Sequence, residues 1–118
     1  MEIERLHNML LEAGIEHEWK DRTPPHWGEL VEEEPHLFGH IVWGWQIIVY
    51  KENGERLVSA IEGYGSYGHS SGFDLDNPGV DLIEIMGLLK PEEEDNGFCG
   101  VQGWLTAEEV FRRIKEAV

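Results

Sequence analysis

The sequence predicts a small α+β fold, in which a mainly antiparallel sheet built around a central Asn-Gly hairpin carries about three helices. Two runs rich in β-branched and aromatic residues, 41–50 and 57–61, flank Asn53-Gly54. Residues 2–13 and 106–117 place their apolar side chains at the spacing of an amphipathic helix. A hairpin and helices in one short chain indicate a sheet with helices packed on one face.

The Asn53-Gly54 turn is the clearest local signal. A two-residue type I′ turn needs positive φ at both central positions, which Asn and Gly tolerate better than other residues. With this turn, Val49 faces Val58 and Ile47 faces Ala60 across the two strands. The face that these residues share is apolar, and we expect it to pack against the helices.

End signals define the helices. Gly14 follows the first amphipathic stretch and is typical of a Schellman motif. Thr106 and Glu109 predict a capping box at the start of the last helix. A third helix is expected to begin at Asp76-Asn77-Pro78 and to end at Pro91. Its buried side chains would be Leu82, Ile83, Met86 and Leu89.

The remaining segments complete one domain of residues 1–118. Short strands are expected at 16–20 and at 98–104. Segment 21–40 contains Thr23-Pro24-Pro25, which opposes a helix, and we expect it to be irregular. Because 118 residues with 41% hydrophobic content can bury one core, no second domain is needed.

The net charge of the chain restricts the kinds of partner that it can bind. The chain has 24 acidic and 9 basic residues, for a net charge of −15. Such a balance disfavours direct binding to nucleic acid and to anionic membranes, since both attract lysine and arginine. The charge either serves solubility or forms an acidic face that imitates nucleic acid and docks on a basic protein. The candidate partner-binding residues are Trp27, Glu32, Glu33, Glu34, Glu92, Glu93, Glu94 and Asp95.

A glycine-rich segment, 63–72, is the candidate ligand site. Four glycines let the backbone approach a ligand, and neighbouring N–H groups can hold an anion. No Gly-Lys-Ser/Thr follows, and no helix starts at the spacing of a dinucleotide-binding loop, so a nucleotide enzyme is disfavoured. The segment can bind a small nucleotide-like signal or serve only as a connection. The candidate ligand-binding residues are Tyr64, Ser66, Tyr67, His69, Ser70 and Ser71.

The sequence predicts neither a metal site nor a cofactor. Asp74-x-Asp76 resembles the start of a calcium loop, but Ile85 stands where such a loop needs glutamate. The six histidines come without a Cys-x-x-Cys pair. A small enzyme using His69 and Cys99 stays an alternative, which requires the two side chains to meet in one pocket.

Four segments carry a recognisable pattern: Trp45–Tyr50, Gly63–Gly68, Leu82–Gly87 and Trp104–Val110. They resemble uncharacterised small acidic proteins encoded by bacteriophages and prophages of Gram-positive gut bacteria. The resemblance implies an accessory protein acting in the bacterial host cytoplasm. The N-terminus has no signal-peptide pattern, and the single cysteine agrees with a reducing compartment.

The sequence therefore favours a non-enzymatic binding protein, in the manner of an anti-defence inhibitor that docks on a basic host protein. A sponge for a small ligand and a small enzyme are the alternatives, and self-association is left open.

Overall fold

The computed structural model describes residues 1–39, 41–66, 82–94 and 100–118. In these residues the chain forms a five-stranded antiparallel sheet with helices, which confirms the α+β prediction. The strands lie side by side in chain order: β1 (Glu18–Asp21), β2 (Trp45–Tyr50), β3 (Arg56–Glu62), β4 (Ile83–Met86) and β5 (Val101–Leu105). The helices are α1 (Glu2–Glu12), α2 (Trp27–Glu33), α3 (Pro35–Phe38), α4 (Pro91–Glu94) and α5 (Ala107–Ala117).

The central hairpin has the predicted register. Val49 pairs with Val58 and Ile47 pairs with Ala60 between β2 and β3. A register shift at Tyr50 lengthens the turn, in which the N–H of Lys51 donates to the carbonyl of Glu55 at 2.7 Å. The hydrophobic alternation therefore set which face of the hairpin is buried.

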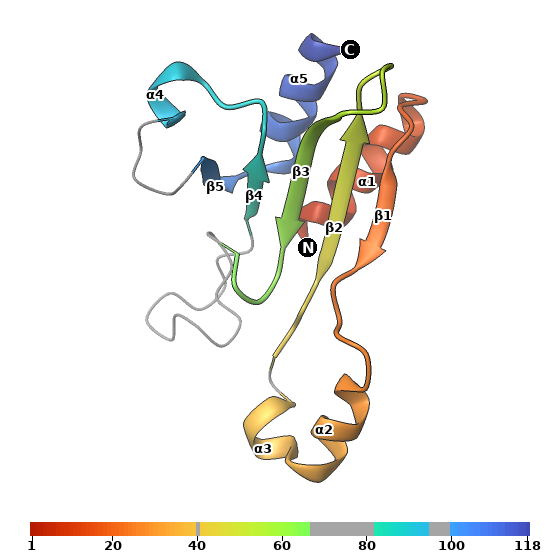
Figure 1. Cartoon of the computed structure of the whole chain (residues 1–118), viewed down its shortest axis with the longest axis vertical. Helices are drawn as coiled ribbons and strands as arrows, with labels where there is room; N and C mark the ends of the chain where they lie inside the picture. The colour runs from red at the N-terminus through yellow and green to blue at the C-terminus, as the bar shows by residue number, and fades with distance from the viewer. Residues whose placement is uncertain (40, 67–81, 95–99) are drawn as a thin grey trace.

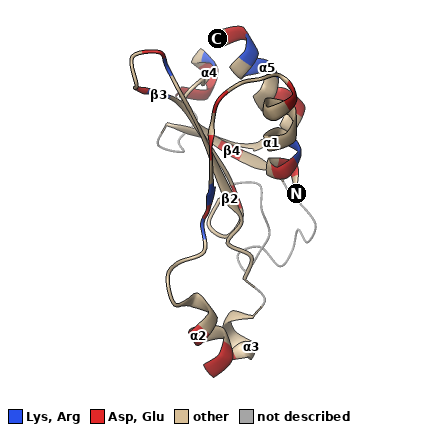
Figure 2. Ribbon diagram, turned by 90° about the vertical axis from the view of Figure 1, so that its right-hand side faces the viewer, with Lys and Arg blue, Asp and Glu red and all other residues tan. Residues whose placement is uncertain are grey.

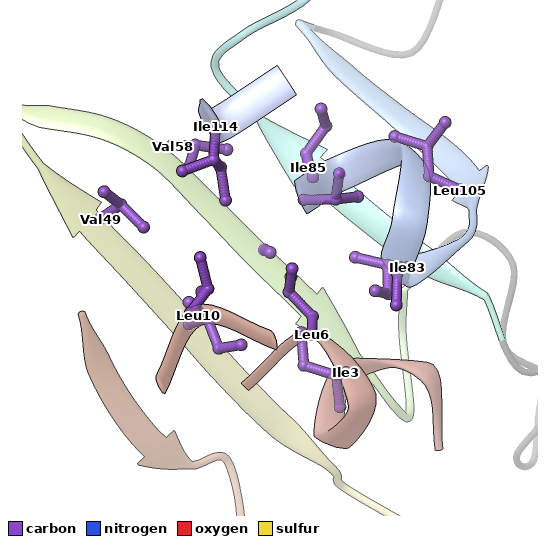
Figure 3. Close-up of a cluster of buried hydrophobic side chains, with 13 residues drawn as sticks. Ile3, Leu6, Leu10, Val49, Val58, Ile83, Ile85, Leu105 and Ile114 are labelled. Atoms are coloured by element: carbon purple, nitrogen blue, oxygen red, sulfur yellow. The ribbon is translucent and has the colours of Figure 1, made fainter. Parts of the chain in front are cut away.

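Helices α1 and α5 cover one face of the sheet, where the core lies (Figure 3). The Schellman motif after α1 is present, since the N–H of Ile15 donates to the carbonyl of Leu10 at 3.0 Å. Thr106 caps α5 by accepting the N–H of Glu109. The core side chains are Ile3, Leu6, Leu10, Ile47, Val49, Val58, Ala60, Ile83, Ile85, Leu105, Ala107, Val110 and Ile114.

The predicted third helix is wrong where the structure describes it. Ile83–Met86 is strand β4, with Ile83 and Ile85 buried and Glu84 and Met86 on the opposite face. A short apolar run suits either a helix or a strand, and pairing with β3 and β5 decides for the strand. The expected start of this helix lies outside the described residues. Pro91 begins the short helix α4 rather than ending a helix.

Segment 21–40 is more regular than predicted, because its prolines stand where a helix tolerates them. Helix α2 begins two residues after Pro25, and Pro35 is the first residue of α3. Strand β2 begins at Trp45 rather than at residue 41, directly after Gly44, whose φ is +76°. None of the described helices has the length and apolar character needed to cross a membrane.

Candidate protein-docking site

Helices α2 and α3, which we call the arm, project beyond one end of the sheet (Figure 1). They pack on each other, and neither helix contains a buried residue. The arm lies at one end of the 45 Å long axis of the molecule. An arm without a buried residue adds little to the core, so its composition needs another explanation than packing.

The arm is acidic, and the basic side chains beside its carboxylates are histidines: His26 lies 3.5 Å from Glu29 and His36 lies 3.5 Å from Glu34. Glu29, Glu32, Glu33 and Glu34 are all exposed. The sequence has no lysine or arginine between positions 23 and 50. Figure 2 shows acidic stretches and no basic stretch on α2 and α3. The arm therefore presents a field of one sign, which attracts a positively charged surface.

Exposed apolar side chains share the arm with these carboxylates. Leu30 on α2 is 41% exposed and Leu37 on α3 is 53% exposed. Val42, where the chain returns to the sheet, is 46% exposed. Large apolar side chains near charged ones are typical of a protein-binding patch.

An arginine joins the two chain segments that lead to and from the arm. The guanidinium of Arg22 donates to the carbonyl of Trp43 at 2.8 Å and to the carbonyl of Tyr64 at 3.0 Å. Its backbone N–H donates to the carbonyl of Gly44 at 3.1 Å. Burial lowers the pKa of Arg22, while the nearby charge of Glu84 opposes this effect. One side chain thus joins the end of β1, the start of β2 and the end of β3.

Aromatic rings continue this junction into the arm. Trp27 of α2 lies edge-on to Phe38 at a centroid distance of 5.3 Å and to Trp43 at 5.2 Å. Trp43 in turn lies edge-on to Tyr64 at 5.1 Å. These contacts restrain the arm, so a partner would meet a surface that is ordered before binding.

The predicted partner-binding residues divide between two places. Glu32, Glu33 and Glu34 are exposed on the arm, but Trp27 is half-buried in the aromatic contacts. Glu92 and Glu94 are exposed on α4, far from the arm (Figure 1). The sequence had not indicated Leu30 and Leu37, because only the fold shows that they are left uncovered. Asp95 lies outside the described residues.

Glu93 has a structural contact instead. Its carboxylate forms a two-point ion pair with the guanidinium of Arg113, at 2.6 and 2.8 Å. The side chains are 13% and 7% exposed. This pair attaches α4 to α5, and Glu93 thus has a contact within the fold that its neighbours Glu92 and Glu94 are not shown to share.

Two candidates of the glycine-rich segment also have structural contacts. The Ser66 hydroxyl is buried, accepts the N–H of Gly63 at 3.1 Å and donates to the carbonyl of the same residue at 2.8 Å. Tyr64 packs on Trp43. The other candidates of this segment lie outside the described residues, and so does Cys99. These candidates are Tyr67, His69, Ser70 and Ser71.

The fold also brings together two histidines that sequence reasoning did not single out. Nδ1 of His7 lies 2.7 Å from Nε2 of His17, and Nδ1 of His17 lies 2.9 Å from the carbonyl oxygen of Ile15. The His7 ring stacks on Trp19 at 4.3 Å, and Trp19 stacks on Trp45 at 4.5 Å. The Schellman turn after α1 reverses the chain, so that His17 comes to lie beside His7. The two residues are ten apart in the sequence, and no local pattern predicts their contact.

The described residues contain no group of three or more His, Cys, Asp or Glu side chains that could hold a metal ion. The His7–His17 contact involves only two such side chains. The arm and the junction at its base are therefore the features that most require a functional explanation. No protein-family description, curated protein or solved structure matches the chain.

Proposed function

We propose that this protein is a non-enzymatic binding protein, which docks through its arm on a basic surface of a partner protein. The observation that carries the proposal is the composition of the arm. Four exposed carboxylates and two exposed leucines project from the sheet in a segment without lysine or arginine.

The two kinds of side chain have different tasks in such a complex. Carboxylates speed the encounter with a basic surface and disfavour acidic competitors. Leu30 and Leu37 would supply the buried area that holds the complex together, at about 25 cal/mol for each Å² removed from water. Because Arg22 and Trp27 already order the arm, docking would lose less conformational entropy than with a mobile segment.

The partner we propose is a protein rather than a nucleic acid. A phosphate backbone would be repelled by the glutamates of the arm, whereas a nucleic-acid-binding surface would be attracted to them. The resemblance to phage-encoded acidic proteins adds the expectation that the partner is a bacterial host protein. Interference with host defence is the role that would follow.

Site-specific crosslinking tests the proposal. A photoreactive residue is placed at Leu37 on the arm, and separately at Glu94 on α4, and each protein is exposed to a lysate of Gram-positive bacteria. We expect one basic protein to crosslink at position 37 and not at position 94. Equal crosslinking at the two positions would contradict docking through the arm.

A matched pair of variants then tests the carboxylates with the purified partner. The arm variant carries Gln at Glu29, Glu32, Glu33 and Glu34. The control carries Gln at four exposed glutamates elsewhere: Glu12, Glu16, Glu92 and Glu94.

Both variants change the net charge equally, so only the position of the charge differs. We expect the arm variant to raise Kd by about tenfold or more and the control by much less. The affinity of the unaltered protein should fall between about 50 mM and about 500 mM salt, as screening weakens charge pairs. An affinity that does not change with salt concentration would contradict the proposal, and so would an equal rise of Kd in the two variants.

A further inference from the structure

A hollow of about 320 Å³ lies where the arm meets the sheet. Three tryptophans line it: Trp27 from α2, Trp43 from the chain returning from the arm, and Trp45 from the start of β2. The rings of Trp27 and Trp43 are nearly perpendicular, at 87°. Asp21, the last residue of β1, also belongs to the lining, with Met1, Thr23, Ile41, Val42 and Gly44.

This combination has the chemistry of a cation site. Indole faces carry negative charge density and attract cations, Trp most strongly among the aromatic residues. Asp21 is exposed and supplies a full negative charge at the hollow. Hydrogen bonds from Thr23 hold the pKa of Asp21 below its ordinary value, so this carboxylate is ionised at neutral pH.

Two cations of the chain lie close to this place and already have partners. The α-amino group of Met1, a residue that also lines the hollow, pairs with Glu4 at 3.3 Å. The guanidinium of Arg22 donates to the two carbonyl groups at the arm junction and is attracted by Glu84. Neither cation is therefore the natural counter-charge of Asp21.

Trp43, which lines the hollow, also contains a buried polar atom. Its indole Nε1 is buried, and no hydrogen-bond acceptor for it is found in the part of the chain that the structure describes. A buried donor without an acceptor costs about 1–3 kcal/mol.

We propose that the hollow binds the guanidinium group of an arginine side chain of the partner, stacked on the tryptophan rings with Asp21 as its counter-charge. This inference rests on the proposed docking function and names the residue type that the partner inserts at the base of the arm. Arginine fits better than lysine, because its planar and weakly hydrated group stacks on aromatic rings and pairs with a carboxylate through two N–H groups. The hollow is at the lower limit of small-molecule pockets, which suits one side chain.

The test uses the whole protein and a small probe, so it does not need the partner. Blocked arginine (N-acetyl-arginine methylamide) is titrated while the indole N–H signals of all five tryptophans are followed by NMR. Blocked citrulline is the matched control, because it has nearly the same shape without the charge. Trp104, which is 48% exposed on β5, provides the internal reference.

We expect blocked arginine to shift the signals of Trp27, Trp43 and Trp45 with a millimolar Kd, which corresponds to about −4 kcal/mol. Citrulline should cause little shift at the same concentration. Asp21→Asn should weaken arginine binding at least about threefold, since it removes the charge and keeps an acceptor for the turn at Thr23. Lys20→Gln, at the exposed neighbour, should leave the binding unchanged.

Three outcomes would overturn the inference. Equal shifts with arginine and citrulline would show that charge is not recognised. Shifts as large at Trp104 as at the hollow would show that the binding has no fixed place. Stronger binding of blocked lysine or tetramethylammonium would assign the hollow to another cation. If the probe fails while crosslinking at position 37 succeeds, the arm still docks and only the arginine assignment is lost.

Discussion

The carboxylate of Glu62 accepts a hydrogen bond from the backbone N–H of Ile3 at 2.9 Å, in a position where Glu62 is fully buried. The last residue of β3 thereby satisfies one of the free N–H groups at the start of α1. Glu2 does the same for α5 by accepting the N–H of Ala107 at 2.7 Å. Two acidic residues of this acidic chain are therefore structural.

Removal of the Glu62 carboxylate should lower stability. We expect Glu62→Ala to reduce the free energy of unfolding by about 1–3 kcal/mol, because a buried N–H loses its acceptor. Glu62→Gln keeps an acceptor and should cost less. Urea denaturation measures both, with the exposed Glu12→Ala as the control. A change below about 0.5 kcal/mol in Glu62→Ala would show that the hydrogen bond contributes nothing.

Gly44 should not tolerate a side chain. A Cβ atom there would lie 1.8 Å from the carbonyl oxygen of Glu62, and its φ of +76° is unfavourable for other residues. We expect Gly44→Ala to cost at least about 2 kcal/mol in thermal or urea unfolding. Gly28→Ala is the matched control: its Cβ meets no atom within 4 Å and it lies in α2, so it should be neutral or stabilising. Equal effects would contradict the close approach of the two chain segments.

Loss of the Arg22 side chain should loosen the arm. We expect Arg22→Gln to increase the rate at which a glutamate-specific protease cuts the arm, since two hydrogen bonds at its base are lost. Lys20→Gln removes a nearby exposed charge without touching the junction and serves as the control. Digestion followed by mass spectrometry locates the cuts. Similar cleavage rates in both variants would mean that Arg22 does not restrain the arm.

The Glu93–Arg113 pair should make stability sensitive to acid. The hydrogen bonds from Arg113 hold the pKa of Glu93 below its ordinary value. The folded state therefore gains stability above the ordinary pKa of glutamate, about 4.3, and loses it as the pH falls through the lowered pKa.

The variant Glu93→Gln tests this pair. At neutral pH it should cost about 3 kcal/mol, because Arg113 stays buried with a weaker partner. The difference from the unaltered protein should shrink below pH of about 4, as urea unfolding at several pH values would show. Glu92→Gln, at the exposed neighbour, should cost little at any pH.

The His7–His17 contact should produce a second pH dependence, nearer neutrality. Desolvation, followed by the charge of His17, lowers the pKa of His7. The unfolded chain then binds more protons, so stability is complete above about pH 6.5 and falls as the pH drops toward the lowered pKa of His7. The facing nitrogens can share one proton, but a second proton would make both of them donors.

Thermal unfolding between about pH 7.5 and pH 5.5 measures this effect. His7→Phe preserves an aromatic ring over Trp19 and should flatten the dependence. His36→Asn, at a mainly exposed histidine of the arm, should leave the dependence as it is. Parallel curves for His7→Phe and the unaltered protein would contradict the assignment.

The candidate site could be predicted only in part. The sequence indicated Glu32, Glu33 and Glu34, because a run of acidic residues beside Pro35 is recognisable without a fold. It could not separate Glu93 from its exposed neighbours, since Arg113 approaches from twenty residues away. Trp27 was expected to be exposed, but it is partly buried and its ring contacts Phe38 and Trp43.

The sequence by itself determined the elements whose signals are local: the amphipathic α1 and α5, the Schellman and capping residues at Gly14 and Thr106, and the register of β2 with β3. Tertiary structure alone decided that Ile83–Met86 is a strand, that the arm projects from the sheet, and that three tryptophans line one hollow with Asp21. The physical reason is the distance along the sequence between the residues that interact. Periodicity, caps and turns depend on neighbours a few residues away, whereas strand pairing, exposure and side-chain clusters depend on segments that meet only in the folded chain.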